Sequence, residues 1–235
     1  LVLPAPRPAR LTRGATSQPL FGASGLGVST PKRIGVFGGA FDPPHLAHVA
    51  LVQTAIDQLQ LDEVRVLPTG QAWHKAHGLS DPAHRLAMTR LAFAGVARAV
   101  VDDREIVRSG PTYTVDTLLE LAGEHPGSQL FLLIGDDQRR SLPAWHRIGE
   151  IARLAIICAA DRDPEVGAWG DASVTKPSSE ASFALPIQPL HMPLMPLSAT
   201  DIRQRIAHHQ PIEGLVPAAV ERYIHEHHLY RPIDD

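Results

Sequence analysis

Strand-like apolar runs and helix-like periodicity alternate along the chain from residue 33 onward. The runs that predict strands lie at 33–37, 63–68, 98–103, 129–135 and 153–160. Apolar residues at helical spacing follow the first run, and further helices are expected at 80–95 and 114–125. In the helix that follows the second run, Ser80 or Asp81 is expected as the cap, with Pro82 in the first turn. The chain therefore consists of repeated units of one strand and one helix.

This repetition predicts the fold class. Strands that alternate with helices at this rhythm form right-handed crossovers and a parallel sheet covered on both faces. We expect an α/β protein: a Rossmann-like, doubly wound parallel sheet with a small C-terminal helical subdomain. Three parts are expected: a flexible N-terminal extension over 1–32, an α/β domain over 33–190 and a C-terminal helical part over 191–235. The polar segment 161–186 is expected to be a surface loop.

Polar motifs follow three of the expected strands. "GGAFDPPHLAH" follows the first, "PTGQAWHK" the second, and "GDD" the run at 129–134. Ligands of doubly wound sheets bind at the carboxyl ends of the strands. The shared placement of these motifs therefore predicts a binding site at that edge.

The composition limits the partners and the cellular compartment that we expect for this protein. The formal net charge is −3, so no general positive field favours long nucleic acid. No apolar run approaches the roughly 18 residues of a membrane span. The single cysteine, Cys158, lies in an apolar run and is interpreted as a buried thiol in a reducing cytoplasm, with a reactive thiol as the alternative. We expect a cytoplasmic protein that binds neither long nucleic acid nor a membrane, and the sequence leaves a homo-oligomer open.

The first motif combines features of a phosphate site. Gly38 and Gly39 allow a close backbone approach after the strand. Asp42 is expected to cap the next helix, with Pro43 in its first turn. Two histidines three residues apart then share one face of that helix: His45 and His48. Because helix starts favour anions, these side chains would extend a phosphate cradle.

Three other interpretations of the histidine pair remain. Both rings could be structural side chains with buried partners, or both could lie on a solvated face. A metal pair is the third, although zinc pairs on one helix are usually four residues apart. No metal site is expected from the sequence.

Two signatures resemble the nucleotidyltransferase superfamily that includes class I aminoacyl-tRNA synthetases. "GGAFDPPHLAH" is similar to G-x-F-x-P-x-H-x-G-H, with Ala47 in place of the second glycine, and "LSATDIR" at 197–203 is similar to I-S-S-T-x-I-R. In the second signature, Thr200 is expected to cap a helix and Arg203 to fork onto phosphate oxygens. The resemblance implies that ATP contacts Gly38, Gly39, Phe41, His45, His48, Gly135, Asp137, Ser198, Thr200 and Arg203.

Three further stretches resemble the nicotinate-nucleotide adenylyltransferase family. They are "LPTGQAWHK", "GPTYTVDTL" at 110–118, and "LIGDD" followed by "LPAW". The resemblance implies that nicotinate mononucleotide contacts His74, Lys75, Thr112, Tyr113 and Trp145. Each stretch also has a simpler interpretation: a solvated lysine, an ordinary helix start and a core tryptophan.

The reaction implied by this resemblance transfers AMP from ATP to nicotinate mononucleotide and gives deamido-NAD and pyrophosphate. The catalytic candidates are His45, His48, Arg203 and Lys75, which would stabilise charge at the α-phosphate. Mg²⁺ is expected to enter with ATP. The alternatives are pantetheine-phosphate adenylyltransferase, a cytidylyltransferase and a nucleotide-binding module without catalysis.

Overall fold

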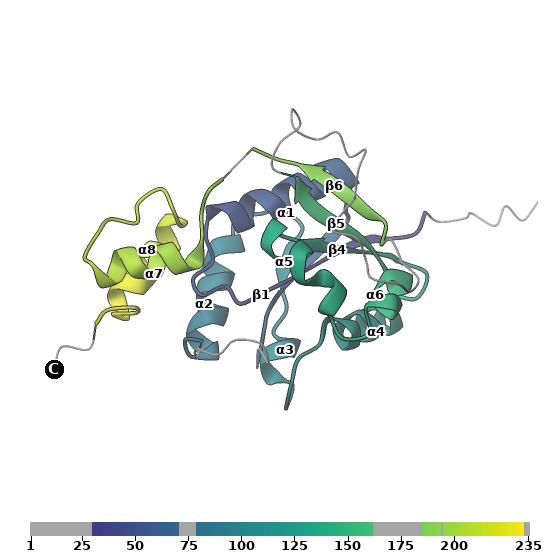
Figure 1. The fold of residues 1–235 in the computed structure, drawn as a ribbon, viewed down its shortest axis with the longest axis horizontal. Coiled ribbons are helices and arrows are strands. Elements are labelled where there is room, and N and C mark those ends of the chain that lie inside the picture. Colours follow the sequence, from purple (N-terminus) through teal and green to yellow (C-terminus); the bar gives the residue numbers. More distant parts are fainter. Residues whose placement is uncertain (1–29, 71–78, 162–184, 194, 233–235) are drawn as a thin grey trace, which may run out of the picture. The chain divides into compact units, whose positions relative to one another are not determined.

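A six-stranded parallel sheet forms the centre of the chain (Figure 1). The computed structural model describes residues 30–70, 79–161, 185–193 and 195–232, and the described residues from 31 onward belong to one compact unit. The strand order is β3-β2-β1-β4-β5-β6. The strands are β1 (Arg33–Gly39), β2 (Glu63–Pro68), β3 (Ala99–Val101), β4 (Gln129–Ile134), β5 (Ala155–Asp161) and β6 (Ile187–His191). The predicted doubly wound sheet is confirmed.

Helices cover both faces of the sheet. They are α1 (Leu46–Leu59), α2 (Pro82–Phe93), α3 (Arg104–Val107), α4 (Thr114–Glu124), α5 (Asp136–Ser141), the 3-10 helix η1 (Leu142–Ala144), α6 (Ile148–Leu154), α7 (Ala199–Ala207) and α8 (Ala218–Glu226). Asp81 caps α2, because its Oδ1 accepts from the backbone N–H of Ala83 at 2.7 Å. Of the two predicted caps, Ser80 and Asp81, the structure has Asp81. No helix within the described residues is long and apolar enough to cross a membrane.

Two hydrophobic clusters occupy the two faces of the sheet. Along β4, Phe131 and Leu133 face the cluster that contains α1, α2, α7 and α8, whereas Leu130 and Leu132 face the cluster that contains α4 and α6. Successive strand residues point to opposite faces, so a run buried on both faces must be apolar throughout. The unbroken apolar run at 130–134 follows from this central position.

The helices of the C-terminal part share the first cluster with the sheet. Ile202 and Ile206 of α7 and Val220 and Ile224 of α8 are buried together with Phe37 of β1. Figure 1 shows α7 and α8 next to each other, and α8 contacts α2. The division into three parts at 32 and 190 stays a prediction. Most of the expected extension and of the expected loop at 161–186 lies outside the described residues.

The predicted start of α1 was wrong. The helix begins at Leu46 with His45 as its N-cap, three residues after the expected cap Asp42. Asp42 is buried and accepts hydrogen bonds from distant residues instead. The strand β6 was not expected at all, because its sequence "IQPLH" mixes polar residues and a proline with few apolar positions.

Candidate active site

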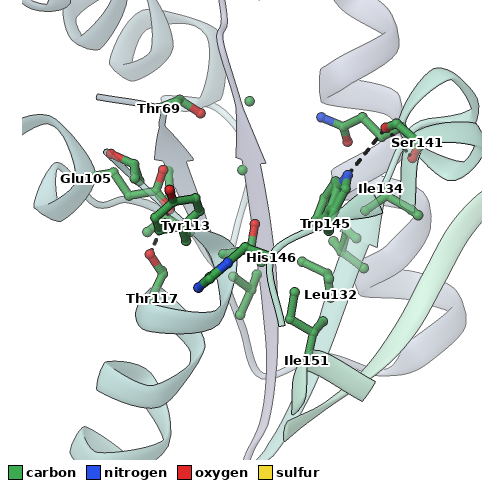
Figure 2. Close-up of a pocket in the computed structure, with 18 of the residues that line it drawn as sticks. Thr69, Glu105, Tyr113, Thr117, Leu132, Ile134, Ser141, Trp145, His146 and Ile151 are labelled. Atoms are coloured by element: carbon green, nitrogen blue, oxygen red, sulfur yellow. Dashed lines mark hydrogen bonds between the residues drawn. The ribbon is translucent and has the colours of Figure 1, made fainter. Parts of the chain in front are cut away.

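A cavity of about 260 Å³ opens at the carboxyl ends of β1, β2 and β4. The order of the strands reverses between β1 and β4, which is where doubly wound sheets bind their ligands. The wall on one side comes from α3 and the start of α4, and the opposite wall comes from α5, η1 and α6. Figure 2 shows Glu105, Tyr113 and Thr117 on one side and Trp145 and Ser141 on the other.

The end of β1 and the loop that follows it form one border of this cavity. Gly38 and Gly39 line the cavity, and a Cβ added to Gly39 would lie 2.9 Å from the ring of Phe41. Glycine therefore lets the Phe41 ring fold back under the strand end. Phe41 is only 1% exposed and packs edge-on against Phe37 and Phe93. Its side chain belongs to the core, so only its backbone remains for the nucleotide contact that the sequence suggested.

The two histidines of the first signature stack on each other. Their ring centroids are 3.7 Å apart, and the backbone N–H of His45 donates to Nδ1 of His48 at 3.1 Å. A neutral His48 ring therefore carries its proton on Nε2. Burial lowers the pKa of His45 to about 4, and the Nδ1 atom of His45 is buried without a hydrogen-bond partner among the described residues. His45 is consequently neutral at pH 7, so it meets an anion first as an uncharged ring.

Distant segments hold this loop in place through Asp42. The hydroxyl of Tyr230 donates to Asp42 Oδ1 at 2.6 Å, and the backbone N–H of Ser80 donates to Oδ2 at 3.1 Å. Arg203 of α7 donates to the carbonyl oxygen of Asp42 at 2.7 Å. The loop is thus fixed by residues up to 188 positions away in the sequence.

Arg85 of α2 is a second anchor that the sequence did not reveal. Its guanidinium is 1% exposed and donates to the carbonyl oxygens of Ala40 at 3.0 Å, Ser80 at 3.0 Å and Gly70 at 3.4 Å. These carbonyls belong to the loop after β1 and to the two ends of the segment after β2. One buried side chain therefore ties the two loops together.

The second signature begins α7, with one correction. Ser198 is the cap, because its Oγ accepts from the backbone N–H of Asp201 at 3.1 Å, so the expected cap Thr200 was wrong. Thr200 accepts from Arg203 at 3.3 Å. Arg203 therefore uses its fork first to join α7 to the loop of Asp42, and the contact with phosphate oxygens stays a prediction for its remaining N–H groups.

The start of α4 carries the predicted pyridine-binding residues. Tyr113 is the N-cap of this helix, and both Thr112 and Tyr113 line the cavity. Thr112 is buried, and its Oγ1 has no hydrogen-bond partner among the described residues. Trp145 lines the opposite wall, where its Nε1 donates to Ser141 Oγ at 3.3 Å. The start of α4 therefore lies on one side of the cavity and a half-buried indole on the other.

Glu105 is a cavity residue that the sequence analysis missed. Its side chain is 6% exposed, and its Oε1 accepts from the hydroxyl of Thr117 at 2.8 Å. Burial raises the pKa of this carboxyl to about 7, and the hydrogen bond from Thr117 opposes that rise. The only sequence signal was a glutamate shortly before "GPTYTVDTL", and ordinary surface helices offer the same pattern.

The remaining predicted residues do not line the cavity in the part of the chain that the structure describes. His74 and Lys75 lie outside the described residues. Gly135 is the N-cap of α5, and Asp137 lies in its first turn.

Cys158 is fully buried, and burial raises the pKa of its thiol to about 12, which confirms an inert core cysteine. Within the described residues, no group of three metal-ligating side chains is close enough to hold a metal ion.

Comparisons with known proteins agree with this geometry. The family model "Cytidylyltransferase-like" matches residues 36–205. The probable nicotinate-nucleotide adenylyltransferase of Albidiferax ferrireducens is 52% identical over 200 residues, which cover 85% of this chain and 98% of that protein. The corresponding protein of Chromobacterium violaceum is 42% identical over 85% of this chain and 99% of its own length.

A solved structure has the same fold. Plasmodium falciparum nicotinic acid mononucleotide adenylyltransferase, complexed with NaAD, superimposes with a TM-score of 0.67. The match covers 85% of this chain and 97% of that chain at 18% sequence identity. At this identity, the likeness bears on the fold alone.

Proposed function

The chain belongs to the nicotinate-nucleotide adenylyltransferase family, and we propose that its two substrates occupy neighbouring parts of the sheet edge. The reaction is the transfer of AMP from ATP to nicotinate mononucleotide, with deamido-NAD and pyrophosphate as products. One observation carries the assignment of the site: the cavity between α4 and Trp145 adjoins the loop that holds the histidine pair.

Nicotinate mononucleotide occupies the cavity in this proposal. Its ring carboxylate lies at the start of α4, where the backbone N–H groups of the first turn and the helix dipole favour an anion. The electron-poor ring lies against the indole of Trp145, which is a favourable cation–π arrangement. Thr112, whose hydroxyl lacks a partner among the described residues, gains one from the ligand. His74 and Lys75 remain proposed phosphate contacts.

ATP lies over the loop after β1. Gly38 and Gly39 allow its close approach, and His48 presents Nε2–H as a donor to phosphate oxygens. The ring of His45 supports this donor by stacking, and Arg203 fixes the loop from α7. The start of α5, with Gly135 and Asp137, is assigned to the adenosine. Ser198 and Thr200 act by ordering the turn that carries Arg203.

The chemistry demands positioning more than proton transfer. A phosphate oxygen of nicotinate mononucleotide attacks the α-phosphorus of ATP, and pyrophosphate leaves. The attacking phosphate is already ionised at neutral pH, so no general base is required. The rate then depends on alignment and on donors aimed at the α-phosphate. Mg²⁺ enters as part of the ATP substrate and is held mainly by phosphate oxygens. The single cysteine forms no disulfide within the chain, as is usual for proteins of a reducing compartment, so we place the reaction in the cytoplasm.

Pyrophosphate release tests this function. The enzyme is mixed with ATP and one of three acceptors: nicotinate mononucleotide, its amide form or phosphopantetheine. We expect the highest kcat/KM with nicotinate mononucleotide. A higher kcat/KM with phosphopantetheine would indicate a pantetheine-phosphate adenylyltransferase instead. No pyrophosphate release with any acceptor would support a nucleotide-binding module without catalysis.

A further inference from the structure

Glu105 is a buried carboxyl group in a cavity that we assign to a carboxylate ligand. Thr117 donates to its Oε1 at 2.8 Å, whereas no described residue donates a hydrogen bond to its Oε2. The side chain shares the cavity with Thr112 and Tyr113 at the start of α4. A second anion placed here would face Glu105 in surroundings with little water, where like charges repel strongly.

We propose that Glu105 determines the preference between the acid and the amide form of the pyridine ring. Protonated Glu105 donates a hydrogen bond from Oε2 to the ring carboxylate, and ionised Glu105 accepts one from the ring amide. This inference rests on the proposed position of the ring in the cavity. It makes a single proton the difference between a site for the acid and a site for the amide.

Tight packing holds Glu105 in this position. A Cβ added to Gly70 would collide with the carbonyl oxygen of Glu105, so the segment just after β2 lies directly against α3. Thr117 also accepts from Arg108 at 3.2 Å, which fixes the hydroxyl that donates to Glu105. Because the backbone and one carboxyl oxygen are both held, Oε2 is the part of the side chain that remains for a ligand.

The surrounding charges leave both protonation states accessible. Burial raises the pKa of Glu105 to about 7, Arg108 lowers it, and Asp102 and Glu120 raise it slightly. Arg108 is itself paired with Glu120 at 2.8 Å, which weakens its pull on Glu105. Within the described residues, the other titratable side chains that line the cavity are Tyr113 and His146. Near neutral pH a ligand carboxylate raises the pKa of Glu105 further, so the acid substrate binds with uptake of a proton.

The pH dependence of substrate preference tests the proposal. The quantity is the ratio of kcat/KM for nicotinate mononucleotide to kcat/KM for its amide form. Both substrates carry the same titrating phosphate, which cancels in the ratio. If each form of Glu105 accepts only one substrate, the ratio falls by up to about tenfold for each pH unit between about pH 6 and 8.

Two variants sharpen the test. Glu105→Gln keeps an acceptor for Thr117 and a donor for the ring carboxylate but cannot titrate, so its ratio should not change with pH. Glu124→Gln removes the same charge from an exposed position on α4 and should keep the slope of the wild-type enzyme. A wild-type ratio that is constant or rises with pH overturns the proposal, as does a Glu105→Gln ratio that still falls.

Binding measurements separate this proposal from the proposed function. Calorimetry of nicotinate mononucleotide binding, in two buffers of different ionisation enthalpy, counts the protons taken up without any turnover. At neutral pH we expect the wild-type enzyme to take up about half a proton more than Glu105→Gln. Equal uptake by the two proteins would overturn the role of Glu105. Binding with this difference but without pyrophosphate release would instead leave Glu105 supported and contradict the adenylyltransferase reaction.

Discussion

The two sides of the site bury titratable groups of opposite kind. We call the part of the site around His45 and His48 the phosphate side, and the cavity between the start of α4 and Trp145 the pyridine side. On the phosphate side, burial lowers the pKa of His45 to about 4, so the ring stays neutral by losing a proton. On the pyridine side, burial raises the pKa of Glu105 to about 7, so a large share of this carboxyl group keeps its proton near neutral pH. The same physical cause acts on a base and on an acid. Desolvation therefore removes positive charge where phosphates are expected and negative charge where a carboxylate is expected.

The two sides also differ in how they are held. Long-range hydrogen bonds from α2, α7 and Tyr230 fix the loop of the phosphate side. The bonds of Trp145 on the pyridine side are local: its backbone N–H donates to Leu142 at 3.0 Å, and its Nε1 donates to Ser141 at 3.3 Å. We infer that the phosphate side is preorganised for catalysis and that the pyridine side serves mainly for binding.

The largest expected effect is a loss of kcat on removing a hydrogen-bond donor from the phosphate side. His48→Ala removes the Nε2–H donor that we assign to the α-phosphate. Loss of a donor aimed at developing charge typically lowers the rate about 100- to 1000-fold, and we expect a fall of that size in kcat. Steady-state pyrophosphate release measures it. A kcat close to the wild-type value would show that the histidine pair is structural, and the unfolding midpoint of the variant checks that the fold is intact.

The opposite pKa shifts predict a second effect, on stability. The pKa of His45 falls from 6.5, so its contribution is complete above pH 6.5 and is lost as the pH falls towards about 4. The pKa of Glu105 rises from 4.5, so its contribution is complete below pH 4.5 and is lost as the pH rises through about 7. Each contribution amounts to about 3 kcal/mol. Between these limits the two trends cancel in the wild-type chain.

Single variants should expose the two trends separately. In His45→Asn only the trend of Glu105 remains, so the free energy of unfolding should decrease as the pH rises from about 4.5 to 6.5. In Glu105→Gln it should increase over the same range. Urea unfolding at several pH values measures both. If either variant follows the wild-type profile, the corresponding group does not have the shifted pKa.

A smaller effect tests the long-range anchoring. Tyr230→Phe removes the 2.6 Å hydrogen bond to Asp42 and leaves this buried carboxylate with one donor fewer. We expect a loss of about 2 kcal/mol in the free energy of unfolding, together with a lower kcat. Tyr223→Phe is the matched control, because its hydroxyl bonds His84 away from the site. Equal losses in the two variants would contradict a special role for the bond at Asp42.

The smallest expected effect concerns the pyridine side. Trp145→Ala removes the indole that we place against the ring, so KM for nicotinate mononucleotide should rise about 5- to 10-fold while kcat changes little. Trp145→Phe should lie between the two. Steady-state kinetics with varied nicotinate mononucleotide measures this split. A fall in kcat as large as that of His48→Ala would contradict the division between catalysis and binding.

The sequence predicted the parts of the molecule that depend on local pattern. The central strands were recognisable because burial on both faces demands continuous apolar runs, and the cap of α2 was limited to Ser80 or Asp81 because both residues come just before Pro82. Asp42 has the same local appearance, before Pro43, yet its side chain is buried among distant donors. A local signal cannot distinguish these two aspartates, since the difference lies in residues brought near by the fold.

The same limit applies to the site. The motifs around His45, Tyr113 and Trp145 were visible as short patterns, and the structure brings their loops to one edge of the sheet. Arg85 and Glu105 were missed because nothing in their neighbouring residues signals burial. Arg85 lies on a helix with a mixed surface, and its importance appears only through three carbonyl groups from two loops. The sequence near a buried charged residue does not signal its role, because its partners come from distant segments of the chain.

The bond between Tyr230 and Asp42 sets an order of events during synthesis of the chain. The ribosome makes Asp42 early and adds Tyr230 188 residues later. A nascent chain that extends through β5 contains the strands β1 to β5. In that chain, the loop after β1 still lacks the hydrogen bonds from Arg203 and Tyr230 to Asp42. The same C-terminal helices also bury Phe37 of β1, so the hydrophobic core of the sheet and the loop after β1 are both completed only when this last part of the chain has been made.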